Sequence, residues 1–190
     1  MKTRYGMAIG LTTLLPAMAW AHPGHDLPGF AQGVLHPLTG LDHLLVMLAV
    51  GAWAAQLGGR LRVWVPTTFV CLMLFGALAG ASGAHVGAIQ QGIAASMCVL
   101  GLLLAGAVRL PKMLCLPMVG AFAVFHGYAH GVEMPQQAGA ALYMSGFVFS
   151  TIALQLAGIA MGTWLLRHRQ AVLRWSGAAM AATGLVLLVA

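Results

Sequence analysis

The sequence predicts an all-α protein, a polytopic bundle of membrane-spanning helices, and three observations support this prediction. Apolar residues make up 61% of the 190 residues and charged residues only 6%, with a mean hydropathy of +0.90. A soluble domain of ordinary composition carries about 25% charged residues. Long apolar stretches recur along the chain. The acidic residues, Asp26, Asp42 and Glu133, are too few to cover a soluble surface.

The first element is a predicted secretory signal peptide, residues 1–21. Two basic residues precede an apolar stretch, and the segment finishes in the small-residue site Ala19-Trp20-Ala21. We expect cleavage after this site, because the apolar core is short and Pro16 interrupts it; the alternative is a first membrane helix. The mature chain, residues 22–190, is then a single six-helix transmembrane domain.

Six apolar segments follow in the mature chain, each close to the ~20 residues that cross a bilayer. They cover residues 35–57, 63–81, 86–107, 113–131, 139–165 and 174–190. Two of them carry glycines one turn apart, Gly76 with Gly80 and Gly158 with Gly162. Small residues at this spacing allow helices to approach closely, so we expect helix contacts there.

The basic residues of the mature chain occupy alternate connections between the predicted spans. These residues are Arg60, Arg62, Arg109, Lys112, Arg167, Arg169 and Arg174. Connections rich in Lys and Arg stay in the cytoplasm, so the first, third and fifth connections are predicted to be cytoplasmic. The mature N-terminus and the C-terminus are then both periplasmic. The signal peptide requires the same side for the N-terminus, and the predicted location is the bacterial inner membrane.

The first span begins with an unusual polar stretch, His36-Pro37-Leu38-Thr39-Gly40-Leu41-Asp42-His43. Pro37 suits the first position of a helix, with His36 just before it. On a continuous helix with about 100° per residue, His36 and His43 lie about 20° apart, and Asp42 flanks them. We therefore expect these three polar side chains on one stripe in the outer half of the membrane.

The fourth span finishes with a second polar stretch, Phe125-His126-Gly127-Tyr128-Ala129-His130-Gly131-Val132-Glu133. His126 and His130 are four residues apart and Glu133 is three further on, so all three can project from one helix face. Because the predicted fourth span runs outward, this stretch also lies in the outer half of the membrane. Two spans can therefore present imidazoles and carboxylates at a similar depth.

Imidazoles and carboxylates together are ligands for divalent transition metals. Ionisable side chains are costly inside a membrane, so a functional role is the default interpretation for such residues. The candidate metal ligands are His36, Asp42, His43, His126, His130 and Glu133. A lone buried histidine often only hydrogen-bonds a neighbour, and Asp42 is alternatively a residue that orients an imidazole rather than a ligand. His168 lies among arginines and is expected to be solvated.

The predicted mature N-terminus offers a further set of donors, His22, His25 and Asp26. Pro23 has no amide proton, so a terminal site that uses the second backbone nitrogen is excluded. Any metal held here would use the imidazoles and the α-amine instead. Accessory metal capture and no metal binding at all are equally compatible with this segment.

The residues resemble the HupE/UreJ family of membrane permeases, which is associated with nickel supply to hydrogenase and urease. The resemblance rests on HPLTGLDHLLVMLAVG, residues 36–51, on FHGYAHGVEMP, residues 125–135, and on the histidine that follows the signal peptide. It spans essentially the whole chain. It implies transport of nickel, or of cobalt in some members, with His36, Asp42 and His43 as functional positions in the first span.

The favoured function is a secondary permease that takes up a divalent metal from the periplasm, nickel first and cobalt next. The sequence has no nucleotide-binding GxxxxGK[ST] loop, and an inside-negative potential favours cation entry by about 2.3 kcal/mol per charge per 100 mV. The expected partners are the transported ion and the lipid bilayer, with no nucleic acid, nucleotide or permanently bound cofactor. Assembly into a homo-oligomer is left open.

Other functions remain as alternatives. A b-type haem protein would use His43 and a fourth-span histidine as axial ligands, but this leaves Asp42 and Glu133 without a role. A metalloenzyme is disfavoured because the HExxH zinc signature is absent, so no catalytic residue is expected. A metal sensor or accessory protein that binds metal without transporting it also fits the residues.

The predicted topology can be tested with reporters fused after Ala190. Because both mature termini are predicted to be periplasmic, a C-terminal alkaline phosphatase should be active, whereas a C-terminal green fluorescent protein should be dark. The opposite pair of results would place the C-terminus in the cytoplasm and contradict the topology.

Overall fold

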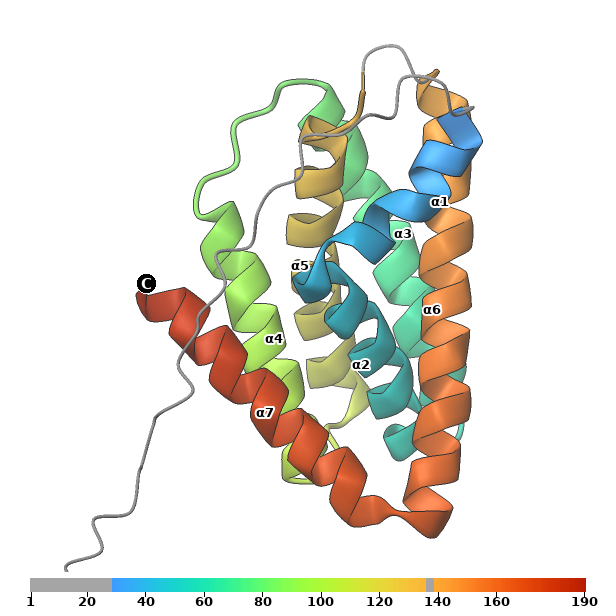
Figure 1. The fold of residues 1–190 in the computed structure, drawn as a ribbon, viewed down its shortest axis with the longest axis vertical. Coiled ribbons are helices and arrows are strands. Elements are labelled where there is room, and N and C mark those ends of the chain that lie inside the picture. Colours follow the sequence, from blue (N-terminus) through green and yellow to red (C-terminus); the bar gives the residue numbers. More distant parts are fainter. Residues whose placement is uncertain (1–28, 136–138) are drawn as a thin grey trace, which may run out of the picture.

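The computed structural model describes residues 29–135 and 139–190. The predicted signal peptide, residues 1–21, and the donor set His22, His25 and Asp26 lie outside the described residues. Within the described ranges, every regular element is a helix and short connections join the helices (Figure 1). The predicted all-α class is confirmed.

The described residues form seven helices: α1 Gly29–Thr39, α2 Leu41–Leu57, α3 Leu61–Ala81, α4 Ile89–Ala105, α5 Lys112–Val132, α6 Ala140–His168 and α7 Gln170–Val189. By length and apolar composition, α3, α5, α6 and α7 can each cross a membrane, and α1 with α2 qualifies as one bent span. Helix α4 is apolar but has 17 residues. Four to five spans are therefore found in the described part of the chain, and six spans with their orientation remain a prediction.

The first predicted span is wrong as a continuous helix. It is two helices, α1 and α2, whose axes differ by 85° across a break at Gly40. Gly40 has an extended backbone, with φ −96° and ψ 115°, which interrupts the helical hydrogen bonds. Pro37 lies inside α1 rather than at its first position. Because proline has no N–H to donate to the preceding turn, it weakens the helix just before the break.

Helix α2 is the centre of the bundle. It packs against α1, α3, α4 and α6, and most of its residues are buried (Figure 1). Val46, Val50 and Trp53 on this helix are fully buried. Its sequence is apolar around the whole circumference, which is the pattern of a helix that other helices surround. At its beginning, His43 is buried in the bundle, whereas the Asp42 side chain is partly exposed.

The main helix pairs, α3 with α5, α4 with α7 and α2 with α6, approach closely at glycines. A Cβ atom at Gly76 would overlap the backbone of Val124, and one at Gly158 would overlap the backbone of Leu48. The predicted contacts at the two glycine pairs are confirmed. Close backbone approach increases the packing contact between apolar helices.

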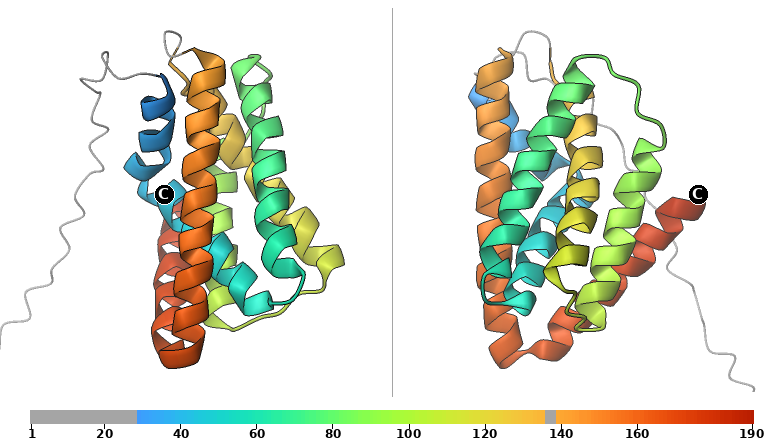
Figure 2. Two further views of the ribbon diagram at one scale, coloured as in Figure 1. Left: turned by 90° about the vertical axis from the view of Figure 1, so that its right-hand side faces the viewer. Right: turned by 180° about the vertical axis from the view of Figure 1, so that it is seen from behind.

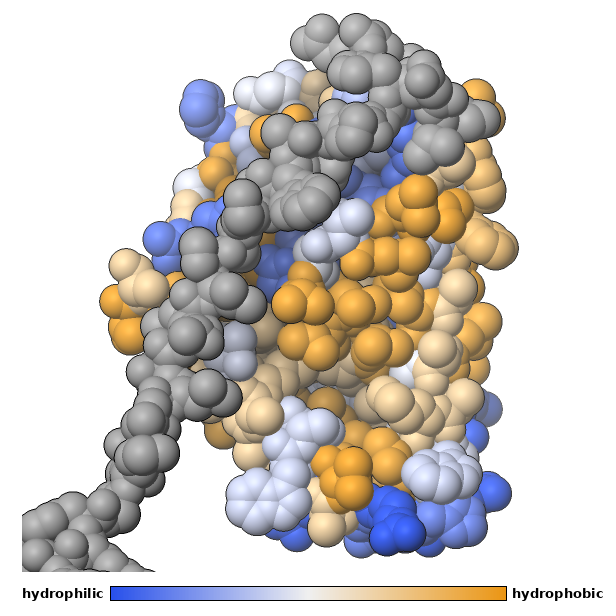
Figure 3. Space-filling view, viewed as in Figure 1, coloured by the Kyte–Doolittle hydropathy of each residue, from blue (hydrophilic) through white to orange (hydrophobic). Residues whose placement is uncertain are grey.

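The two ends of the bundle differ in charge. The connections α2–α3, α4–α5 and α6–α7 lie at one end (Figure 2), and these connections together with the adjoining turns of the helices carry all the Lys and Arg residues of the described ranges. We call this the basic end. It is hydrophilic in the space-filling view, whereas the middle of the same face is apolar (Figure 3). Helix α7 begins at the basic end and tilts away, so that its C-terminus lies at about mid-height of the bundle in all three ribbon views (Figures 1 and 2).

Replacing Gly158 with alanine should destabilise the protein, because the new Cβ meets backbone of α2 that cannot move aside as a side chain can. Overpacking of this kind costs about 1–3 kcal/mol. The measurement is thermal unfolding of the purified protein in detergent. Gly87→Ala is the matched control, because a Cβ atom there meets nothing within 4 Å. Equal melting temperatures for the two variants would contradict the close packing.

Candidate metal centre

The break at Gly40 sets the positions of the first three candidate ligands. His36 lies in the last turn of α1, and Asp42 and His43 lie in the first turn of α2. Because α1 meets α2 at 85°, His36 approaches from a different direction than the other two. The expected single stripe on one helix is therefore wrong, although the three side chains still reach a common region.

Helix α5 supplies the other three candidates at its C-terminal end. His126 and His130 are one turn apart on its buried face, and Glu133 follows the last residue of the helix. Exposure increases along this series: His126 is 0% exposed and His130 1%, whereas the Glu133 side chain is 52% exposed. The series therefore runs from the interior of the bundle to its surface.

The six residues form one connected group, which we call the histidine cluster. Its outer part is a rim trio, the partly exposed His36, the buried His130 and the exposed Glu133, whose potential ligand atoms all lie within 4.8 Å of one another. The His36 Nε2 and a Glu133 carboxylate oxygen are 3.1 Å apart. The hydrogen bond from His36 lowers the pKa of Glu133 below its ordinary value, so the carboxylate is ionised at neutral pH.

The deeper part of the histidine cluster is a buried trio, His43, His126 and His130. The ring centroids of His43 and His130 are 4.3 Å apart, and those of His43 and His126 are 4.9 Å apart. His130 also contacts His36 of the rim trio, at 4.7 Å. His130 is thus shared by both trios, and the four imidazoles form a continuous series from His36 to His126.

Asp42 orients His43. Its Oδ1 atom accepts a hydrogen bond from His43 Nδ1 at 2.9 Å and another from the His43 backbone N–H at 2.9 Å. A neutral imidazole that donates through Nδ1 has its free lone pair on Nε2. The Nε2 atom of His43 is buried and has no hydrogen-bond partner among the described residues. Asp42 thereby holds a free donor nitrogen inside the histidine cluster, a role that the sequence left as an alternative to direct ligation.

Ser96 of α4 orients His126 in the same way. The Ser96 hydroxyl donates to the Ile93 carbonyl at 2.6 Å, and its oxygen lies 2.9 Å from His126 Nε2. Because the hydroxyl has one proton and the carbonyl can only accept, His126 donates through Nε2–H to Ser96. The lone pair of His126 is then on Nδ1, which is buried and without a partner in the described part of the chain.

The buried trio is unusual for an apolar interior, because four of its six ring nitrogens have no hydrogen-bond partner among the described residues. Both ring nitrogens of His130 also lack a hydrogen-bond partner within the described ranges. A buried polar group without a partner costs roughly 1–3 kcal/mol in proteins. These free lone pairs are nitrogen donors that a transition-metal ion accepts, but within the described ranges only the rim trio brings three ligand atoms within 4.8 Å of one another.

Aromatic residues that the sequence did not single out complete the surroundings of the histidine cluster. Phe147 packs against His130 with ring centroids 4.3 Å apart, and Tyr143 lies beside His36 at 5.7 Å. Both are on α6 and are buried. Neither they nor Ser96 stand in a recognisable motif. Their only sequence signal is a place in an apolar helix, which gives no indication of the partner.

The remaining histidines of the described ranges, His85 and His168, do not join the histidine cluster. His168 is exposed at the basic end, where its ring lies 5.5 Å from that of Trp164. This agrees with the expected solvated position. His85 is exposed in the α3–α4 connection. The N-terminal donors cannot be placed, because they precede the described residues.

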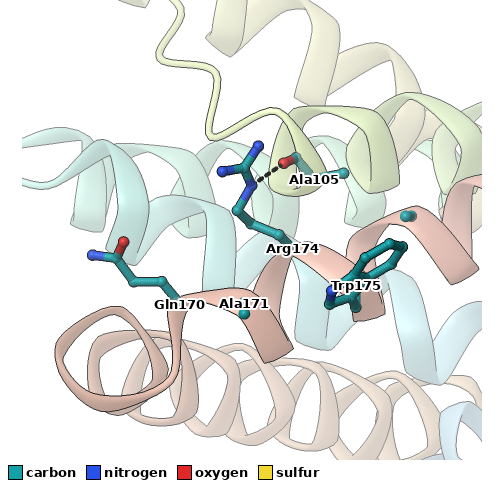
Figure 4. A pocket seen from close by; sticks show the side chains of 6 residues that line it. Ala105, Gln170, Ala171, Arg174 and Trp175 are labelled. Atoms are coloured by element: carbon teal, nitrogen blue, oxygen red, sulfur yellow. Dashed lines mark hydrogen bonds between the residues drawn. The ribbon is translucent and has the colours of Figure 1, made fainter.

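Two hollows of the structure lie away from the histidine cluster. One hollow of about 470 Å³ lies between α3 and α6, and another of about 470 Å³ lies between the end of α4 and the start of α7 (Figure 4). No residue of the histidine cluster lines either of them. These two hollows are therefore separate from the candidate metal centre.

An apolar helical bundle with a buried group of histidines and carboxylates defines the class, a polytopic membrane protein with a candidate metal centre. Residues 10–187 match the family described as HupE / UreJ protein. The chain belongs to the HupE / UreJ family, and the resemblance seen in its two motifs is confirmed. It is also 40% identical over 177 residues to "Protein HupE" of Rhizobium leguminosarum bv. viciae, which covers 92% of each chain. No solved structure matches the chain.

Replacing Ser96 with alanine should release the tautomer of His126, because Nε2–H loses its acceptor and the proton can also occupy Nδ1. Nitrogen-15 NMR of histidine-labelled protein at alkaline pH should show one His126 tautomer in the wild type and a mixture in S96A. Ser145→Ala is the matched control, since Ser145 makes the same bond to a carbonyl three residues before it and no histidine contact is found for it. An unchanged His126 signal in S96A would contradict the assignment.

Proposed function

We propose that the protein is a secondary permease that takes up a divalent transition metal from the periplasm, nickel first and cobalt next. The observation that carries this proposal is the continuous series of imidazoles from the half-exposed rim to the fully buried His126. A site that only stored an ion would need one group of ligands. A series that shares His130 between two groups supports movement of the ion from one to the next.

The chemistry of the donors supports a divalent first-row metal. Neutral imidazoles suit nickel and cobalt, and the Asp42 and Glu133 carboxylates supply negative charge that offsets the charge of the ion. Glu133 is the most exposed member of the histidine cluster. An arriving hydrated cation would therefore meet a carboxylate and His36 first. As it exchanged water for imidazole nitrogens, it would move to the buried trio.

The proposed driving force is the membrane potential. The chain has no nucleotide-binding loop, and an inside-negative potential favours entry by about 2.3 kcal/mol per charge per 100 mV. Membership of the HupE / UreJ family supports nickel as the first choice of substrate, because this family is associated with nickel supply to hydrogenase and urease. Imidazole and carboxylate ligands alone do not separate nickel from cobalt.

The haem alternative is disfavoured by the packing of the candidate axial ligands. The His43 and His126 rings meet edge to face with centroids 4.9 Å apart. Two axial imidazoles must lie on opposite sides of a porphyrin, and rings in direct contact leave no space for one between them. A protein that binds metal without transporting it remains the second candidate, because its ligands would be the same.

Transport through the histidine cluster predicts that His43→Ala and His126→Ala each reduce uptake of radioactive nickel to about a tenth or less at equal protein level. This is at least the loss seen when an outer-shell partner of a metal ligand is removed. The double variant should be scarcely worse than either single variant, because residues that act as one unit are not additive. The assay is initial uptake into proteoliposomes with an inside-negative potential.

His168→Ala is the control, because this exposed histidine lies at the basic end, away from the histidine cluster. It should transport at the wild-type rate. Normal uptake by both cluster variants would place the pathway elsewhere. Wild-type protein that binds nickel but does not move it into vesicles would favour the accessory or sensor function instead.

A further inference from the structure

The hollow between α4 and α7 is a separate feature of the basic end. It is lined by Ala105, Gln170, Ala171, Arg174, Trp175 and Ala178, and its volume is about 470 Å³ (Figure 4). Three of these residues are alanines, Ala105 at the end of α4 and Ala171 and Ala178 on α7. Their small side chains leave the space between the two helices open. We call it the α4–α7 hollow. None of its residues contributes to the histidine cluster.

Arg174 is held in the α4–α7 hollow by one end of its guanidinium group. The Nε atom donates to the Ala105 carbonyl at 2.8 Å, which satisfies one of the last carbonyls of α4 (Figure 4). No hydrogen bond to the two terminal nitrogens is found among the described residues. A guanidinium fixed in this way presents its terminal N–H groups in one direction, which is the geometry that binds a phosphate with two parallel hydrogen bonds.

The charge around Arg174 favours an anion. Both acidic residues of the described ranges, Asp42 and Glu133, belong to the histidine cluster, so no carboxylate there neutralises the basic end. Arg167 and Arg169 precede α7 and lie near the same end. The described residues therefore leave the positive potential at the entrance of the α4–α7 hollow unbalanced.

The remaining lining residues favour a lipid over a small free anion. Trp175 is next to Arg174 and is 75% exposed, a combination found where a helix passes through the headgroup level of a membrane. The alanines give an apolar wall, and the exposed Leu185, about three turns further along α7 and on about the same side of the helix as Arg174, continues it. Gln170 donates to the Leu166 carbonyl and keeps an amide oxygen that can accept from a headgroup hydroxyl.

We propose that the α4–α7 hollow binds one anionic glycerophospholipid, with its phosphate on Arg174 and its acyl chains along the apolar face of α7. Basic pockets between membrane helices recognise such headgroups. The lipid would join the end of α4 to the start of α7. This matters for α7 because it packs mainly on α4 and has few contacts with α6.

The test is native mass spectrometry of the full-length protein in detergent with added phosphatidylglycerol or phosphatidylcholine at equal concentration. Wild type should retain one phosphatidylglycerol and release phosphatidylcholine. Arg174→Gln should weaken phosphatidylglycerol retention about fivefold or more, the share of one arginine at a membrane surface. Arg167→Gln is the matched control, since it removes the same charge at the same end without lining the α4–α7 hollow. It should retain the lipid.

A second variant tests the hollow itself. Ala171→Phe keeps Arg174 and its hydrogen bond to Ala105 but fills the α4–α7 hollow with an aromatic ring, so this variant should also lose the lipid. It tests the proposal even if R174Q does not purify. Equal losses in R174Q and R167Q would mean that only the general charge of the basic end matters. Retention by A171F, equal binding of phosphatidylcholine, or displacement of the lipid by inorganic phosphate would each overturn the proposal.

Discussion

The bend between α1 and α2 is the constraint on which the histidine cluster depends. In a continuous helix, His36 and His43 would lie roughly 10 Å apart along the axis, so both could not contact one imidazole. Because the chain turns by 85° at Gly40, both reach His130, with ring centroids 4.7 and 4.3 Å away. A Cβ atom at position 40 would lie 3.0 Å from Asp42 Oδ1, so glycine also leaves room for the Asp42–His43 hydrogen bond.

Hydrogen bonds from outside the imidazole series decide which nitrogens are free. Asp42 binds Nδ1 of His43, and Ser96 binds Nε2 of His126, so the remaining lone pairs are on atoms that have no hydrogen-bond partner in the described part of the chain. The apolar surroundings make this arrangement costly for the empty protein, since buried polar groups without partners are unfavourable. An ion that accepted these lone pairs would remove this cost.

The bundle separates two kinds of charge along its length. The carboxylates and clustered histidines lie with α1, the start of α2 and the end of α5, whereas the described Lys and Arg residues lie at the basic end. A cation is therefore attracted to one region and repelled from the other, while anionic lipid headgroups are attracted to the basic end. The membrane function and the lipid contact that we propose use opposite ends of one helical framework.

Composition and two short motifs were enough to predict the helical membrane class, the family and the six polar residues of the histidine cluster, because hydropathy and ligand chemistry are properties of local sequence. The break at Gly40 was not predicted, because the hydropathy averaged over an apolar segment does not change when a single residue in it has an extended backbone. Ser96 was not predicted either, because its role depends on α4 lying beside α5. The hydrophobic effect has no preferred direction, so an apolar sequence predicts that a helix is buried but not which helix lies beside it. The free lone pair of a histidine depends on a hydrogen bond from another segment of the chain. Only the tertiary structure decides which segments meet.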